Sequence, residues 1–195
     1  MKEDTRKSIM ETAVKLFAEK GFKDTSISKI AKGADVGKGT IYWHFDSKED
    51  LFFSIIKEKG KTYFDKVVQL DRSDLSPKEV IFKYIKGRIE FIDKNYKLAE
   101  MLINNNDVIN REFKELMEKK HRQSVAVLEK AIQRGIDNQL FREGPSNEIA
   151  LMIINATNSA HNNFSCSLKG DTEERTKKIF DFIMYGLVGG KNNEK

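Results

Sequence analysis

Only two prolines, Pro77 and Pro145, interrupt this chain of 195 residues. Between and around them, apolar residues recur at intervals of three and four, which is the period of an amphipathic helix. No segment of the sequence alternates apolar and polar residues with the two-residue period of a half-buried strand. The sequence therefore predicts an all-α protein with about nine helices.

Short helices are expected near the N-terminus. An apolar stripe that includes Ile9 and Phe17 predicts a first helix ending near Gly21, because glycine readily takes the left-handed conformation of a helix cap. The second helix should begin at Thr25 or Ser26, either of which can cap its first turn. The third is expected from Lys38 to His44.

Later helix starts are marked by local patterns. Ser47 with Asp50 has the spacing of a capping box and predicts a fourth helix that continues to about Leu70. Ser76 and Glu79 form a second capping box around Pro77, and the apolar stripes that follow indicate a central helix. The remaining helices are expected at residues 96–103, 110–137, 147–164 and from Asp171 or Thr172 onward.

The composition restricts where and how the chain works. The net charge of +5 is a small excess in a chain with 33% charged residues, so charge alone does not indicate a nucleic-acid partner. Cys166 is the only cysteine, which excludes a disulfide within the chain and fits a reducing compartment. No apolar run approaches the ~20 residues of a membrane span. We expect a cytoplasmic protein with no membrane partner.

The stretch from Gly39 to Phe52 carries the most specific signal. It reads Gly-Thr-Ile-Tyr-Trp-His-Phe-Asp-Ser-Lys-Glu-Asp-Leu-Phe and follows a short expected helix and a tight turn, the arrangement of a helix-turn-helix. With the helix before them, residues from about Ile9 to Phe52 resemble the DNA-binding domain of TetR-family regulators. The usual turn of that family reads Ala-Gly-Val-Ser, whereas this chain has Ala34-Asp35-Val36-Gly37.

The resemblance implies two domains and a function. Residues 1–50 would form a helix-turn-helix DNA-binding domain, and residues 51–195 a helical domain for effector binding and dimerisation. The chain would be a ligand-responsive transcriptional regulator, most often a repressor in this family. It would bind a palindromic double-stranded DNA operator as a homodimer and be released by a small-molecule effector.

The DNA-contacting residues follow from the same resemblance and from the chemistry of their side chains. From Met1 to Asp50 the net charge is only +1, so contact must depend on placement rather than on bulk attraction. Ile41 and Phe45 are expected to be buried anchors of the third helix. Asp35 can take the left-handed turn, and Gly37 is a weaker cap than serine. The predicted DNA-binding residues are Thr25, Ser26, Lys38, Gly39, Thr40, Tyr42, Trp43, His44 and Lys48.

The second domain resembles the family in its helical layout only. An effector pocket among the fourth to eighth helices would be mostly apolar and would suit an apolar or aromatic molecule. Its predicted lining is Phe64, Tyr84, Arg88, Phe91, His121, Asn155, Asn158 and His161. The last two helices would pair in the dimer through Met152, Ala156, Ala160, Ile179, Ile183 and Leu187.

The asparagine row, His121 and the function of the chain each have more than one interpretation. The row of Asn155, Asn158 and Asn162 fits a solvated face, a hydrogen-bonded strip in the dimer or a polar pocket wall. His121 fits a satisfied core histidine or a pocket group. Neither a catalytic motif nor a set of metal ligands is evident in the sequence, so we expect no enzyme activity, cofactor or metal. The alternative function is a helical scaffold that keeps the fold without reading DNA.

Overall fold

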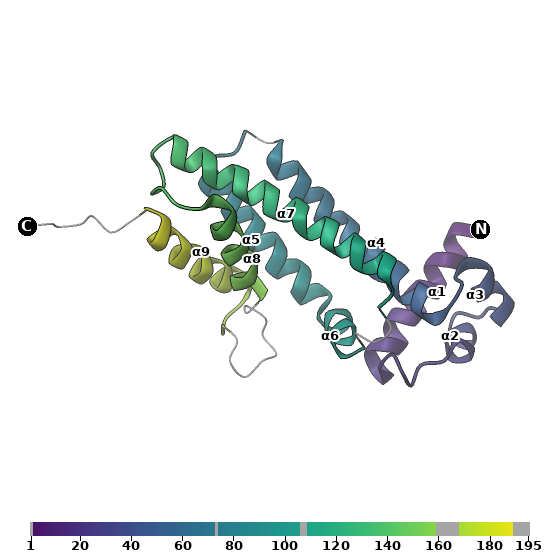
Figure 1. The fold of residues 1–195 in the computed structure, drawn as a ribbon. Coiled ribbons are helices and arrows are strands. Elements are labelled where there is room, and N and C mark those ends of the chain that lie inside the picture. The colour runs from purple at the N-terminus through teal and green to yellow at the C-terminus, as the bar shows by residue number, and fades with distance from the viewer. Residues whose placement is uncertain (1, 73, 106–108, 159–167, 189–195) are drawn as a thin grey trace, which may run out of the picture. The chain divides into compact units, whose positions relative to one another are not determined.

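The computed structural model describes residues 2–72, 74–105, 109–158 and 168–188. All regular elements in these ranges are helices, which confirms the predicted all-α fold (Figure 1). The helices described are α1 (Lys2–Lys20), α2 (Ile27–Gly33), α3 (Lys38–His44), α4 (Lys48–Asp71), α5 (Pro77–Lys94), α6 (Tyr96–Asn104), α7 (Arg111–Asp137), α8 (Ser146–Asn158) and α9 (Thr172–Val188).

Local signals that predicted the helix starts are visible as hydrogen bonds. The Ser47 hydroxyl accepts from the backbone N–H of Asp50 at 3.0 Å, and the Asp50 carboxylate accepts from the N–H of Asp46 at 3.1 Å. Ser76 and Glu79 form the complete reciprocal box, with the Ser76 N–H donating to the Glu79 carboxylate at 2.9 Å. Gly21 has a positive φ of 81°, as expected for the residue that ends α1.

The chain forms two compact units. The first comprises residues 1–61 and 95–115, and the second comprises residues 62–94 and 116–195. The first unit therefore contains α6, the N-terminal part of α4 and the first residues of α7 in addition to the predicted 1–50 module. Its core is aromatic, with the rings of Phe17, Phe22 and Phe52 between 5.1 and 5.7 Å apart.

In the second unit α5 is central, as its two apolar stripes predicted. It contacts both α8 and α9. Its buried positions are Pro77, Val80, Ile81, Tyr84, Ile85 and Ile89.

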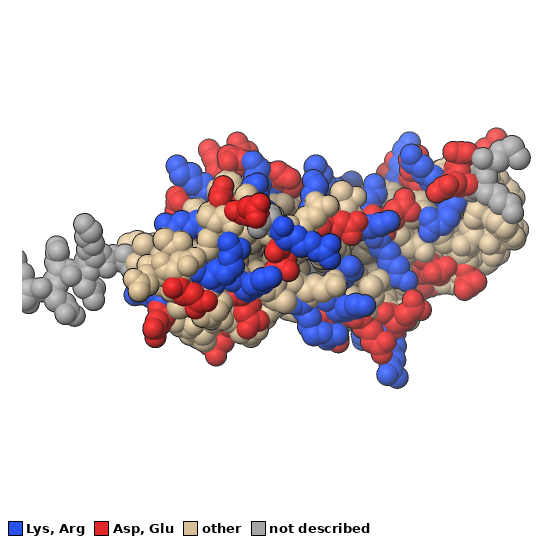
Figure 2. Space-filling view, turned by 90° about the horizontal axis from the view of Figure 1, so that it is seen from above, with Lys and Arg blue, Asp and Glu red and all other residues tan. Residues whose placement is uncertain are grey.

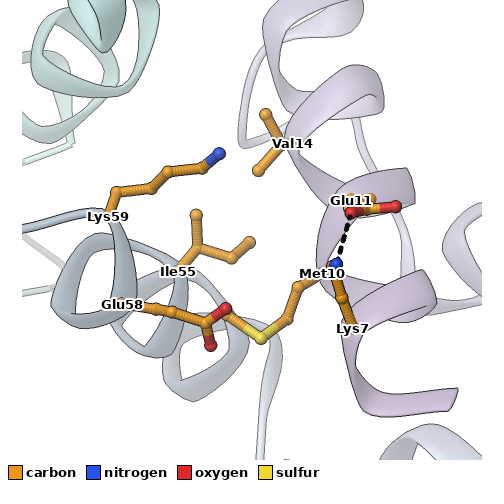
Figure 3. A pocket seen from close by; sticks show the side chains of 7 residues that line it. All are labelled: Lys7, Met10, Glu11, Val14, Ile55, Glu58 and Lys59. Atoms are coloured by element: carbon orange, nitrogen blue, oxygen red, sulfur yellow. Dashed lines mark ion pairs between the residues drawn. The ribbon is translucent and has the colours of Figure 1, made fainter. Parts of the chain in front are cut away.

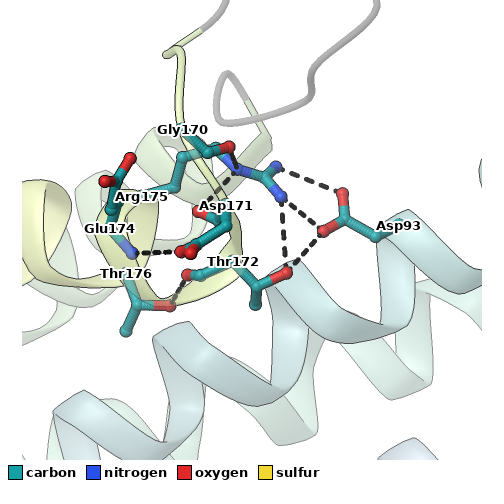
Figure 4. Close-up of polar contacts among 7 residues, drawn as sticks. All are labelled: Asp93, Gly170, Asp171, Thr172, Glu174, Arg175 and Thr176. Carbon is teal, nitrogen blue, oxygen red and sulfur yellow. Dashed lines mark hydrogen bonds and ion pairs between the residues drawn. The ribbon is translucent and has the colours of Figure 1, made fainter.

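A buried ion pair joins the start of α9 to the end of α5 (Figure 4). Arg175 is 2% exposed, and its Nη1 donates to the Asp93 carboxylate at 3.1 Å. The guanidinium also donates to the carbonyl oxygens of Gly170 and Asp171, while the Thr172 hydroxyl donates to Asp93 at 3.0 Å. Each side of the ion pair thus has additional hydrogen-bond partners, which a buried charge requires.

Two pockets are lined entirely by residues of the first unit. One of about 220 Å³ lies between α1 and α4, where Lys7, Glu11, Glu58 and Lys59 surround an apolar floor that includes Met10 (Figure 3). The other, of about 290 Å³, lies between α1 and α6. Within the described residues, no helix is both long enough and apolar enough to cross a membrane.

Candidate functional site

The turn between α2 and α3 is held by backbone bonds and one left-handed residue. The Val36 N–H donates to the Ala31 carbonyl at 3.0 Å, and Asp35 has φ of 54°, which confirms the predicted left-handed turn. Ser26 caps α2, with its hydroxyl accepting from the Lys29 N–H at 3.3 Å. Gly37 stands at the N-cap of α3 and supplies no side-chain bond, as predicted.

One side of α3 is buried and the other is exposed. Ile41 is 0% exposed and Phe45 is 2% exposed, so both are core anchors as predicted. Tyr42 and Trp43 are 55% and 62% exposed, which is unusual for aromatic residues held on a well-anchored helix. The His44 ring lies edge-on to the Trp43 ring, with the centroids 4.5 Å apart. The helix thus presents a polar and aromatic surface outward.

The two glycines of this region are not required by packing within the protein. A Cβ atom at Gly39 would meet no protein atom within 4 Å. At Gly37 it would meet only the Thr40 hydroxyl, at an ordinary contact distance of 3.8 Å. Lys38 and Gly39 are exposed, and Thr40 is half-buried beside them. Any need for a glycine at position 39 must therefore come from outside the protein.

The structure corrects the predicted role of Thr25. Its side chain is 0% exposed, and its hydroxyl donates to the Gly21 carbonyl at 2.8 Å and lies 3.3 Å from the Leu16 carbonyl. This hydroxyl closes the α1–α2 loop and cannot reach a phosphate. The exposed neighbour, Ser26, keeps the position from which a phosphate contact is possible.

Lys48 has an internal role that the sequence did not predict. Its ammonium donates to the Phe22 carbonyl at 2.8 Å and lies 4.3 Å from the centre of the Phe22 ring. Both interactions lie within the first unit. They fix the start of α4 against the α1–α2 loop, since a cation over an aromatic face is attracted electrostatically. The predicted phosphate contact of Lys48 stays a prediction.

The predicted effector-pocket residues differ in how deeply they are buried in the second unit. Tyr84 is 1% exposed, and Phe64, Arg88 and Phe91 are half-buried. His121 is exposed, so it is not the core histidine that was one of its two predicted roles, and its role in a pocket stays a prediction. Asn155 is also exposed, which argues against a pocket wall at this position and leaves a solvated face or a dimer strip. The side chain of Asn158, and all of Ala160, His161, Asn162 and Cys166, lie outside the described residues.

The predicted dimer surface needs a larger correction. Ile179 and Leu187 are 4% and 6% exposed because they pack into the core of their own unit. Ile183 and Ala156 are half-buried. The exposed apolar side chains of α8 and α9 are Met152 (66%), Phe182 (77%), Tyr185 (76%) and Val188 (46%). The sequence analysis assigned the stripe of Ile179, Ile183 and Leu187 to the dimer, because periodicity does not show whether a stripe faces the unit's own core or a partner.

Comparison with known proteins identifies the family. The family model for bacterial regulatory proteins of the tetR family matches residues 9–55. The fatty acid metabolism regulator protein of Bacillus subtilis is 27% identical over 149 residues, which cover 76% of this chain and 77% of that protein. A TetR/AcrR-family regulator from Thermobifida fusca has a TM-score of 0.79 at 20% identity, covering 98% of this chain and 99% of that one. The chain belongs to the TetR family of transcriptional regulators.

Other relatives match over different lengths. The HTH-type transcriptional regulator YuxN of Bacillus subtilis is 34% identical over 121 residues, or 62% of this chain, but only 42% of YuxN is covered. FadR from Bacillus subtilis, solved in complex with stearoyl-CoA, has a TM-score of 0.70 at 24% identity and covers 92% of this chain and 97% of that one. At these identities, the likeness to the solved structures shows the TetR fold.

Proposed function

We propose that this protein is a homodimeric repressor that binds a palindromic operator through α3 and leaves it when a small molecule binds to the second unit. The observation that carries the DNA-reading role is the surface of α3. Its exposed aromatic pair, with Lys38 and Thr40 nearby, stands on a helix that Ile41 and Phe45 fix to the core. A short helix that offers hydrogen-bonding side chains without bulk at its first turn suits a major groove.

Within this proposal, the residues of α3 and its surroundings have separate tasks. Lys38, Thr40 and Tyr42 carry groups that can bond to bases or phosphates, and Gly39 allows the backbone to approach the DNA. Trp43 and His44 extend the surface, and Ser26 lies at the exposed cap of α2. Lys48 begins α4, whose helix N-terminus provides backbone N–H groups suited to a phosphate.

The experiment that tests DNA reading is selection of bound sequences from a random pool. A TetR-type dimer should return a palindrome whose half-sites are about one DNA turn apart, roughly 34–36 Å. Thr40→Ala should weaken binding to the selected sequence by about 1–3 kcal/mol if the hydroxyl reads a base. Equal binding to all sequences, in protein with unchanged folding, would instead favour the scaffold alternative.

The dimer surface in this proposal is the exposed stripe of Met152, Phe182, Tyr185 and Val188. Single exposed apolar residues are common, but two aromatics more than 70% exposed on consecutive turns of one helix indicate a covered face. Phe182→Glu should convert the dimer to a monomer in sedimentation while the helix content stays unchanged. A wild-type protein that sediments as a monomer at micromolar concentration would contradict the proposed interface.

The effector in this proposal is an apolar or aromatic small molecule bound among the helices of the second unit. Support comes from the stacked rings of Tyr63 and Phe91 in the second unit and from the B. subtilis FadR structure, which was solved with stearoyl-CoA. The test is release of labelled operator DNA by panels of acyl-CoAs, fatty acids, antibiotics and dyes. No release by any compound would count against a ligand-controlled repressor.

A further inference from the structure

The cavity of about 290 Å³ between α1 and α6 lies wholly within the first unit. Its apolar lining includes Phe17, Phe22 and Met101. Its polar side chains are those of Lys97, Glu100 and Asn105. Pockets for drug-sized ligands measure roughly 300–1,000 Å³, so a cavity of this size suits a molecule of about one ring. Among the described residues, none of α3 and none of the second unit lines it.

Asn105 is the buried polar residue of this cavity. It is 7% exposed, and its Nδ2 donates to the Met101 carbonyl at 2.8 Å. That bond fixes the orientation of the amide, because a carbonyl oxygen can only accept. The amide oxygen, Oδ1, receives no hydrogen bond from any residue that the structure describes, and Asn105 lines the cavity, where a donor can reach it. Since buried polar atoms are normally hydrogen-bonded, this oxygen indicates a ligand that donates.

The charges around the cavity favour a cation. The cavity lies beside the C-terminal end of α1, where backbone carbonyls without helical partners carry a partial negative charge. The chain itself shows this preference, because the Lys97 ammonium donates to the Ala18 carbonyl at 3.4 Å. Glu100 adds a carboxylate that forms no ion pair with a described residue. An amide oxygen, a carboxylate and a helix C-terminus therefore surround one small cavity.

We propose that this cavity binds a primary ammonium compound with a short apolar body, such as a single-ring amine. An ammonium group has three N–H donors, which the Asn105 amide oxygen, the Glu100 carboxylate and the end of α1 can accept. The apolar body packs against Phe22 and Met101. A carboxylate in the same place would meet Glu100 and the negative end of α1, so it is disfavoured. This site is distinct from that of the proposed effector in the second unit and does not depend on it.

The binding experiment uses three probes that share a phenyl ring on a short chain and differ at the polar end. Phenethylamine, phenethyl alcohol and hydrocinnamate are titrated into the full-length protein by calorimetry, without DNA. Phenethylamine should bind with a Kd of about 1 mM or lower, the alcohol more weakly, and the carboxylate least. Absence of amine binding, or binding of the alcohol or the carboxylate as tightly as the amine, would overturn the proposal.

Two variants test the acceptors. Glu100→Gln removes the charge of an exposed residue and should raise the Kd for phenethylamine by about 3- to 5-fold. Asn105→Leu removes the buried acceptor and should raise this Kd by about 3- to 10-fold. Because Asn105→Leu also removes the hydrogen bond to Met101, its folding is checked by urea unfolding followed through Trp43 fluorescence. An unchanged Kd in Glu100→Gln, or in folded Asn105→Leu, would overturn the proposal.

Glu19→Gln is the matched control. Glu19 is exposed in the last turn of α1 and does not line the cavity, so the same loss of charge near the same helix end should leave the Kd unchanged. An effect as large as that of Glu100→Gln would show general attraction for cations and overturn the proposal. Lys97→Met removes a like charge from the cavity and should lower the Kd. A higher Kd in Lys97→Met would show that the ligand needs a cationic partner and would also overturn the proposal.

Discussion

Replacement of Gly37 by serine tests how α3 is positioned. Gly37 has φ of −70° and ψ of 152°, an extended conformation that serine adopts without strain. Its Cβ atom would contact only the Thr40 hydroxyl, at 3.8 Å. A serine hydroxyl there can accept from the N–H of Gly39 or Thr40, as the Ser47 hydroxyl does from Asp50 at the start of α4.

The expected gain has two parts. A serine cap is worth a few tenths of a kcal/mol more than a glycine cap. Loss of glycine's freedom in the unfolded chain adds about 0.4–1 kcal/mol. We therefore expect Gly37→Ser to stabilise the first unit by about 1 kcal/mol. Operator affinity should stay unchanged or rise.

The assay can use a single intrinsic probe. Trp43 is the only tryptophan in the chain and lies on α3, so its fluorescence during urea unfolding reports on this helix. Gly37→Ala is the control, because it restricts the unfolded chain in the same way but cannot accept a hydrogen bond. Serine should exceed alanine by about 1 kcal/mol. Equal stability of the two variants would refute the capping argument, and a large loss of operator affinity in the serine variant would refute our account of the turn.

Three other predictions concern single positions. Gly39→Ala should stabilise α3 by up to about 1 kcal/mol in urea unfolding, yet weaken operator binding in an anisotropy titration; unchanged affinity would show that DNA does not approach this backbone. Arg175→Met should destabilise the second unit by about 1–3 kcal/mol in thermal unfolding, because the Asp93 carboxylate loses its cationic partner and keeps only the hydrogen bond from the Thr172 hydroxyl. A loss within error of zero would show that the ion pair is dispensable. Hydrogen bonds from Ser76 lower the pKa of Glu79 below its ordinary value of 4.5. These hydrogen bonds should therefore stabilise the folded protein fully above pH 4.5, and this stabilisation should be lost as the pH falls through the folded-state pKa. The stability difference between wild type and Glu79→Gln should therefore shrink in acid. A difference that does not change with pH would contradict the stabilising role of the ionised Glu79 carboxylate.

Features set by neighbouring residues were predictable from the sequence. The capping boxes at Ser47 and Ser76 and the left-handed Asp35 depend on contacts within a few residues, which the order of side chains reveals. Burial of Ile41 and Phe45 was also predictable, because a short helix with exposed polar neighbours has one apolar side to cover.

Features set by distant residues were not predictable. Thr25 and Ser26 are both good capping residues, and only the fold of the α1–α2 loop decides that Thr25 turns inward. Similarly, α9 has apolar side chains on two sides, and periodicity cannot show which side meets α5 and α8.

The small net charge of the DNA-binding module bears on how the module can gain affinity for DNA. Two of its lysines already have partners within the protein, because the Lys29 ammonium donates to the Asp24 carbonyl and the Lys48 ammonium to the Phe22 carbonyl, both at 2.8 Å. Acidic and basic groups are interspersed over the surface seen in Figure 2. Attraction for phosphates that does not depend on sequence grows with the number of cations that neutralise them. A module with a net charge of only +1 must therefore gain more of its affinity from the fit of α3 in the groove. In the proposed function, the position of that helix is then the quantity that an effector has to change.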